Sequence, residues 1–144
     1  MIISGFPGVG KSTLGRNPDF KNTVDFDSSN NKTDNFPSDY VDRAILKSVA
    51  GETVLVSSHK AVRDALLKRQ HPFTLIYPAM DRKEEFLENY RARGNTPEFL
   101  TLLDEHWEAW IREIEAIPGT DHLGVVTLVK LEAGQWAEDV YKRT

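Results

Sequence analysis

Short apolar runs alternate along the chain with longer segments in which apolar residues recur at helical spacing. The runs are rich in Val, Ile, Leu and Phe and end at polar or turn-forming residues, which is typical of buried strands. We predict five strands, at residues 1–3, 23–27, 52–57, 73–77 and 123–129. The intervening segments predict helices at residues 11–17, 39–50, 60–69, 81–93, 97–117 and 135–142, with a polar loop or small cap at 28–38.

Several helix boundaries carry specific signals. Ser38 is expected to be the N-cap of the second helix, which Gly51 would end. Asp81 is expected to cap the helix that follows the fourth strand, and Thr96 before Pro97 predicts an N-cap with proline in the first helical position. The apolar residues of that last long helix are expected to lie in the core: Leu100, Leu103, Trp107, Trp110, Ile111 and Ile114.

Strands that alternate with helices, and that are apolar throughout, predict a parallel sheet covered on both faces. We therefore expect a single α/β domain over residues 1–144, with a five-stranded parallel sheet in a three-layer α/β/α architecture. Ligands of such sheets bind at the carboxyl ends of the strands. That rule brings together, at one edge, residues 5–13, 25–27, 57–59, 77–78 and 130–134.

The first of these segments contains a phosphate-binding motif. Residues 5–12 read GFPGVGKS and fit the P-loop pattern G-x-x-x-x-G-K-[ST] between a strand and a helix. Glycine permits positive φ, so that successive backbone N–H groups can surround phosphate oxygens. Lys11 would reach the β- and γ-phosphates of a nucleotide, and the Ser12 hydroxyl would hold Mg²⁺. We assign ATP binding to Gly8, Val9, Gly10, Lys11, Ser12 and Thr13.

A pair of carboxylates follows the second predicted strand. Asp25 and Asp27 are two positions apart at a strand end, so their side chains are expected to point to the same side. A phosphoryl transferase needs one carboxylate to organise Mg²⁺, and often another to orient the attacking hydroxyl or accept its proton. The alternative is a pair of solvated carboxylates in a turn.

Arg91 and Arg93, followed by Gly94, predict a short lid over residues 91–96. The transition state of phosphoryl transfer spreads negative charge over the transferred group, and an arginine on a mobile segment can neutralise it. Gly94 would permit the hinge motion. A solvated helix face is the alternative for these arginines.

The acceptor side is less sharply defined. His59 and Arg63 are four residues apart, so they share one face of the helix that opens after the third strand. We assign Ser28, His59 and Arg63, together with Asp27, to acceptor binding. A purely structural role is the alternative for His59 and for Arg63.

Two sequence matches to GTPase motifs are misleading. Residues 31–34 spell N-K-x-D and residues 121–124 spell D-x-x-G, but their order is the reverse of that in GTPases and neither follows a strand. The strand at 52–57 also lacks a terminal Asp, which disfavours a Walker-B ATPase.

The composition narrows the remaining possibilities. The chain has no cysteine, which excludes disulfides and thiol nucleophiles, and no apolar run long enough to span a bilayer. Because the first strand starts at Met1, we expect no cleaved leader and a cytoplasmic protein that does not bind membranes. The net charge of −4 argues against extensive wrapping by nucleic acid. Local contacts with nucleic acid remain open because the basic residues cluster: Lys60, Arg63, Lys68 and Arg69, then Arg82, Lys83, Arg91 and Arg93.

The chain resembles the small P-loop kinases. Nucleoside monophosphate kinases and shikimate-kinase-like enzymes share the G-x-P-G-x-G-K-S loop, and the latter carry a D-x-D element that matches residues 25–27. The strings GFPGVGKST, DFDSS, VLVSSHKAVRDALL, FTLIYPA and YRARGN are similar to small phage and bacterial kinases, some assigned as 5-hydroxymethyluracil DNA kinases. The resemblance implies that Asp25 serves the metal and Asp27 the acceptor, that Arg91 and Arg93 close over ATP, and that adenine lies near residues 130–134.

These observations lead to one expectation and two alternatives. We expect an ATP- and Mg²⁺-dependent phosphotransferase with Lys11, Asp27, Arg91 and Arg93 as catalytic residues and Ser12 and Asp25 as metal ligands. The expected acceptor is a 5-hydroxymethyluracil base in phage DNA, which would place the protein in the host cytoplasm. The alternatives are a kinase of nucleoside monophosphates or other small molecules, and a nucleotide-gated binding module without an acceptor.

Overall fold

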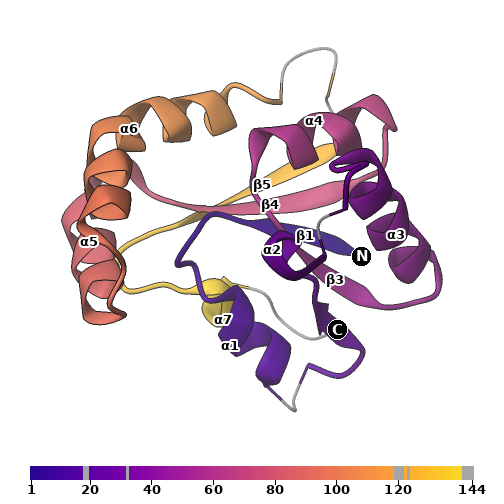
Figure 1. Cartoon of the computed structure of the whole chain (residues 1–144), viewed down its shortest axis with the longest axis horizontal. Coiled ribbons are helices and arrows are strands. Elements are labelled where there is room, and N and C mark those ends of the chain that lie inside the picture. Colours follow the sequence, from indigo (N-terminus) through magenta and orange to yellow (C-terminus); the bar gives the residue numbers. More distant parts are fainter. Residues whose placement is uncertain (18–19, 32, 119–121, 123, 141–144) are drawn as a thin grey trace.

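The computed structural model of the chain describes residues 1–17, 20–31, 33–118, 122 and 124–140. Its centre is a five-stranded sheet with the strand order β2-β3-β1-β4-β5 (Figure 1). Every neighbouring pair is parallel. The strands are β1 (Ile2–Gly5), β2 (Thr23–Asp25), β3 (Thr53–Ser57), β4 (Phe73–Pro78) and β5 (Val126–Leu131). The parallel five-stranded fold predicted from the apolar runs is confirmed.

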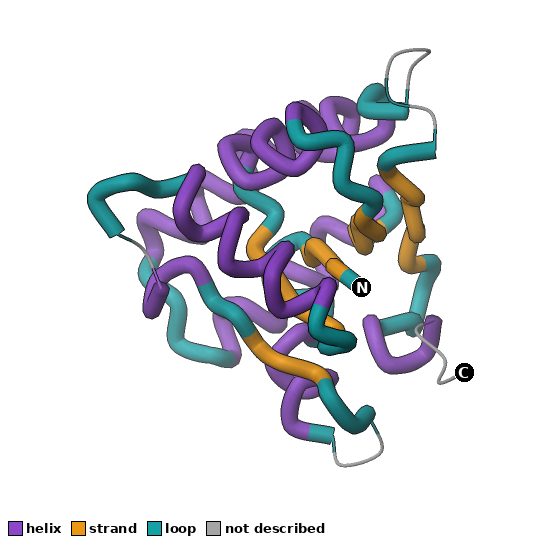
Figure 2. Tube along the Cα trace, turned by 90° about the vertical axis from the view of Figure 1, so that its right-hand side faces the viewer, coloured by secondary structure: helices purple, strands orange, loops and turns teal. Residues whose placement is uncertain are grey.

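Helices cover both faces of this sheet (Figures 1 and 2). On one face, α1 (Lys11–Arg16) packs against β2, and α7 (Ala137–Val140) packs against α1 and β5. On the other face lie α3 (Ser38–Val49), α4 (Lys60–Lys68) and α6 (Pro97–Glu115). The short α2 (Ser28–Asn31) follows β2, while a 3₁₀ turn, η1 (Met80–Arg82), and α5 (Lys83–Ala92) follow β4. None of the described helices is long and apolar enough to cross a bilayer.

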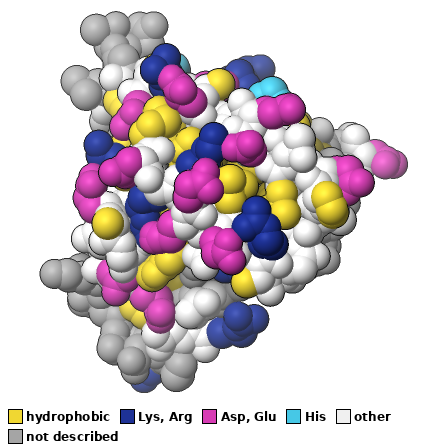
Figure 3. Space-filling view, turned by 90° about the vertical axis from the view of Figure 1, so that its left-hand side faces the viewer, with side chains coloured by type: hydrophobic (Ala, Val, Ile, Leu, Met, Phe, Trp, Pro, Cys, Tyr) yellow, Lys and Arg dark blue, Asp and Glu magenta, His cyan; other side chains and the backbone are white. Residues whose placement is uncertain are grey.

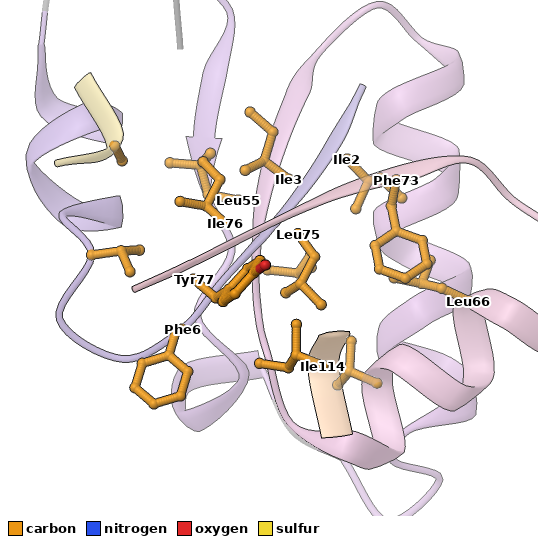
Figure 4. Close-up of a cluster of buried hydrophobic side chains, with 14 of the residues drawn as sticks. Ile2, Ile3, Phe6, Leu55, Leu66, Phe73, Leu75, Ile76, Tyr77 and Ile114 are labelled. Carbon is orange, nitrogen blue, oxygen red and sulfur yellow. The ribbon is translucent and has the colours of Figure 1, made fainter. Parts of the chain in front are cut away.

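The core lies between the sheet and the helices on each side (Figure 4). Ile2, Leu55 and Leu75 come from neighbouring strands and are at most 1% exposed. Burial of such aliphatic side chains on both faces of a parallel sheet explains why the strands are apolar throughout. On α6, Trp107 belongs to this core, whereas Trp110 is only partly buried. The expectation that both tryptophans are core residues is therefore right for Trp107 alone.

Three helix boundaries test the capping predictions. Thr96 is the N-cap of α6, and its hydroxyl accepts a hydrogen bond from the Phe99 N–H at 3.2 Å, as predicted. Ser38 is the first residue of α3 instead of its cap, because the Pro37 carbonyl already accepts the first helical bond. Asp81 lies inside η1 and caps nothing, since a 3₁₀ turn precedes α5.

The last strand and the last helix are shifted relative to the prediction. β5 ends at Leu131 because its final residues, Lys130 and Leu131, pair with the end of β4. Lys130 is thus part of a strand and not of the loop expected at 130–134. α7 begins at Ala137, later than the predicted residue 135, and residues 141–142 of the predicted helix lie outside the described residues. Pairing with a neighbouring strand, which local sequence does not reveal, sets the length of β5.

Candidate active site

The P-loop crosses the carboxyl end of β1 and leads into α1. Gly8 has φ 84° and Gly10 has φ 102°, both in the left-handed region that glycine adopts without strain. Gly10 is the N-cap of α1 and its carbonyl accepts the Leu14 N–H at 3.0 Å, but no side chain caps the helix. At these two glycines the loop has the positive φ that the motif predicts.

Lys11 is held against the inside of the loop. Its Nζ donates a hydrogen bond to the Gly5 carbonyl at 3.1 Å. The stem packs so closely on Gly5 that a Cβ there would lie 2.7 Å from Lys11 Cγ and Cδ. Burial lowers the pKa of Lys11, and the nearby charges of Asp25 and Asp27 act in the opposite direction. This half-buried ammonium inside the loop is a cation that phosphate oxygens could bind.

Asp25 and Asp27 flank the buried Phe26 and are both exposed. α1 fixes the first of them, because a Cβ on Gly15 would lie only 3.1 Å from the Cβ of Asp25. Glycine at position 15 therefore lets α1 approach β2 closely enough to bring the aspartates beside Lys11. Both carboxylates act electrostatically on the lysine of the P-loop. The structure brings together these residues, which we selected from two separate motifs.

Tyr40 holds the backbone between Asp25 and Asp27 in place. Its side chain is fully buried and stacks on Phe26 with ring centroids 4.7 Å apart. The hydroxyl donates to the Phe26 carbonyl and accepts the Ser57 N–H at 3.4 Å. Burial raises the pKa of Tyr40 to about 12, so the phenol stays neutral at physiological pH. Sequence reasoning missed Tyr40, although a tyrosine on the apolar face of the helix after the D-x-D element was a usable signal.

A cavity of about 490 Å³ opens on the lid side of the P-loop. Its walls come from the P-loop glycines, from the end of α5 and from the segment after β5. The lining residues are Gly8, Gly10, Thr13, Asn89, Ala92, Arg93, Trp136, Glu138 and Asp139. The resemblance to kinases places adenine near residues 130–134, but the segment that reaches this cavity is 136–139.

Arg82 holds that segment in place. Its guanidinium is 3% exposed and donates to the carbonyls of Leu131 (3.3 Å) and Gln135 (2.8 Å). It also forms an ion pair with Glu85 and lies 4.9 Å from the centroid of the Trp136 ring. The sequence alone placed Arg82 only in a basic cluster. Its partners Leu131 and Gln135 lie 49 and 53 residues further along the chain, so no local pattern indicates these contacts.

The segment is also bonded to the P-loop itself, since the Ala137 N–H donates to the Val9 carbonyl at 2.8 Å. From α5, the Tyr90 hydroxyl donates to the Pro7 carbonyl and its ring packs against Gly8. Two segments that are remote in sequence therefore contact the P-loop.

Only one of the two predicted lid arginines reaches the cavity. Arg93 lines it, whereas Arg91 is exposed and pairs with Glu88 at 2.8 Å on the outer side of α5. The connection between α5 and α6 spans residues 93–96, with Gly94 at φ 82°. The segment predicted to be a lid therefore consists of the end of α5 and this short turn.

A second cavity, of about 410 Å³, lies between the start of the P-loop, the start of α4 and α6. The predicted acceptor residues His59 and Arg63 both line it. Arg63 is 7% exposed, and its guanidinium pairs with Glu113 at 2.7 Å and donates to the Ser58 carbonyl at 2.9 Å. Ser28, the third predicted residue, is buried at 4% exposure and lines neither cavity.

The residues present also suit a magnesium ion held jointly with phosphates. Mg²⁺ at such sites uses one or two carboxylates, water and phosphate oxygens. Asp25 and Asp27 are exposed carboxylates beside the P-loop lysine. The side chain of Ser12, the other predicted ligand, lies outside the described part of the chain. Among the described residues there is no group of three or more His, Cys, Asp or Glu that would form an all-protein metal site.

Comparison with known proteins does not assign the chain to a family. No family model matches the sequence, and no curated protein matches it.

Proposed function

We propose that the protein is an ATP- and Mg²⁺-dependent phosphotransferase acting on a hydroxyl of a nucleotide-like acceptor. The observation that carries the proposal is the juxtaposition of Lys11 with Asp25 and Asp27 at a P-loop that has one cavity on each side. A turn that only connected β1 to α1 would need neither the half-buried lysine nor the two carboxylates.

The donor fits the cavity lined by the P-loop glycines and Arg93. Loop N–H groups and the Lys11 ammonium would bind the β- and γ-phosphates, and Arg93 approaches the same space from the lid turn. Mg²⁺, when bound with the nucleotide, would neutralise phosphate charge, with Asp25 as its protein ligand.

The transfer step needs an acceptor hydroxyl in line with the γ-phosphorus. The bond between the γ-phosphorus and the β–γ bridging oxygen breaks, a bond from the hydroxyl oxygen to that phosphorus forms, and ADP leaves. Asp27 takes the hydroxyl proton, which its exposed position beside Lys11 allows. Tyr40 orients this carboxylate indirectly, by fixing the backbone of the preceding residue.

For the acceptor we propose a 5-hydroxymethyluracil base in DNA, with a nucleoside monophosphate or another small molecule as the alternative. A base extruded from a DNA strand would present its hydroxymethyl group to Asp27. The outer face of α5 and α6 intermingles acidic and basic side chains (Figure 3). Binding of DNA there would rest on local contacts and not on a large positive field.

The test is a comparison of Asp27→Asn with a matched control, Asp104→Asn. Asp104 is an exposed carboxylate on α6 that pairs with Lys83 and lines neither cavity. Asp27→Asn should retain ATP binding and lose transfer at least a hundredfold, while Asp104→Asn should transfer like the parent protein. ATP binding with slow hydrolysis and no transfer by the parent protein to any acceptor would instead support a nucleotide-gated module.

A further inference from the structure

The second cavity has walls that suit a flat ring. Phe6 and Pro7 close one side at the start of the P-loop, and Phe99, Leu102 and Trp110 form the α6 side. Phe99 and Trp110 pack against the core and are only partly buried, while Leu102 is 46% exposed. One face of the Trp110 ring stacks on His106, with ring centroids 5.4 Å apart. Aromatic walls of this kind bind planar ligands by stacking.

One end of the cavity offers a hydrogen-bond donor beside an acceptor. Arg63 and Glu113 form a pair through Nη2 and Oε1 at 2.7 Å, and Arg63 Nε donates to the Ser58 carbonyl. Within the described structure, no hydrogen bond engages Arg63 Nη1 or Glu113 Oε2. An N–H donor next to a carboxylate oxygen complements a ligand edge that has a carbonyl next to an N–H.

The charges of the cavity disfavour a phosphate. Glu113 neutralises Arg63 and would repel an anion bound beside it. Lys60, the other lysine or arginine in the lining, is exposed and pairs with Asp64 at 2.6 Å. A nucleotide phosphate bound at either cation would therefore lie beside a carboxylate, that of Glu113 or that of Asp64.

We propose that this cavity binds an uncharged heteroaromatic ring with an imide or lactam edge, stacked on Trp110 and read by the Arg63–Glu113 pair. The inference rests on the proposed function in one respect: the ring would carry the hydroxyl that accepts the phosphoryl group near the P-loop. It adds what the proposed function leaves open, namely that the protein recognises the base and not a phosphate of its acceptor. The ring can belong to a free nucleoside or to a nucleic acid strand.

Calorimetric binding to the full chain without ATP tests the proposal, with thymidine and N3-methylthymidine as matched probes. N3-methylthymidine has the same ring but carries a methyl group in place of the imide N–H, so thymidine should bind at least tenfold more tightly. Trp110→Ala should weaken thymidine binding about tenfold. Trp110→Phe should keep most of the affinity of the parent protein because it retains an aromatic face. Leu46→Ala, on the exposed side of α3, is the control and should bind like the parent protein.

A thymine-containing single strand, measured in parallel, separates the two sources of the ring. Binding of either probe with the Trp110 dependence supports the proposal, and the stronger probe identifies the source. Equal binding of thymidine and N3-methylthymidine, displacement of thymidine by inorganic phosphate, or binding of neither thymidine nor the strand would overturn it. Binding by Trp110→Ala is compared only if its thermal unfolding is cooperative. If it is not, Trp110→Phe and the two nucleosides test the proposal. Thymidine lacks the accepting hydroxymethyl group, so binding of the ring is measured independently of phosphoryl transfer. Ring binding can therefore fail while transfer is observed, and transfer can fail while the ring binds.

Discussion

The close contact between Gly8 and Tyr90 allows a sharp test of how the P-loop is built. Gly8 and Gly10 both have positive φ, at 84° and 102°, so alanine at either position carries backbone strain of about 1–2 kcal/mol. Their surroundings differ. A Cβ on Gly8 would lie 2.6 Å from the Tyr90 hydroxyl oxygen and 2.8 Å from its Cζ, whereas the nearest atom to a Cβ on Gly10 is 3.8 Å away.

Tyr90 cannot easily move aside. It is 3% exposed, it packs edge-on against Phe86 and Phe99, and its hydroxyl is bonded to the Pro7 carbonyl. Overpacking at such a position costs a further 1–3 kcal/mol or so. We therefore expect Gly10→Ala to lower the free energy of unfolding by about 1–2 kcal/mol and Gly8→Ala by about 2–5 kcal/mol.

Urea unfolding followed by circular dichroism measures both losses, provided that the slope with denaturant is unchanged. In a Tyr90→Ala background the overlap is removed, so Gly8→Ala should cost no more than Gly10→Ala does in the parent protein. Equal losses for the two single variants, or a Gly8→Ala loss that Tyr90→Ala leaves intact, would refute the reasoning.

Three further predictions concern buried polar groups. Lys11→Met should reduce transfer by orders of magnitude. Its unfolding temperature should stay the same or rise, because burial lowers the pKa of Lys11 and so disfavours the charged form. A lower unfolding temperature would contradict this. Glu113→Gln should lower the free energy of unfolding in urea by about 2–3 kcal/mol, because it leaves the buried Arg63 cation without its partner. Arg63→Met should lower it by only about 1 kcal/mol, because the carboxylate that it leaves is half-exposed. The reverse order would contradict this arrangement of the pair. Because the pKa of Tyr40 is raised, its contribution to stability is complete below pH 10 and falls by roughly 3 kcal/mol as the pH rises from 10 to about 12. Tyr40→Phe should flatten this part of the curve of unfolding free energy against pH. An unchanged slope would contradict the assignment.

The fold was predictable because it depends on patterns that are local in the sequence. Apolar runs of strand length, separated by helical periodicity, specify a parallel sheet covered on both faces, and the P-loop marks where the first strand ends. Boundaries that depend on a neighbour were not predictable. β5 extends to Leu131 because β4 provides a partner in Pro78, and Asp81 enters a 3₁₀ turn and does not cap α5.

The site divides in the same way. The glycines of the P-loop and the D-x-D element lie within short segments, so their roles could be proposed from spacing alone. Arg63 looks like a free cation in the sequence, but its partner Glu113 lies 50 residues away on α6. Likewise nothing local indicates that Trp136 lines the cavity beside the P-loop glycines, since Arg82 and the P-loop position its segment from distant parts of the chain.

The most direct test of the central claim is ³¹P NMR of the parent protein mixed with ATP, Mg²⁺ and an acceptor. Single-stranded DNA containing 5-hydroxymethyluracil and a free nucleoside monophosphate are offered separately. We expect ADP to appear together with an equal amount of a new phosphorus signal on an acceptor, first of all a phosphomonoester on the hydroxymethyl group. Unchanged ATP, or ADP accompanied only by inorganic phosphate, would contradict it.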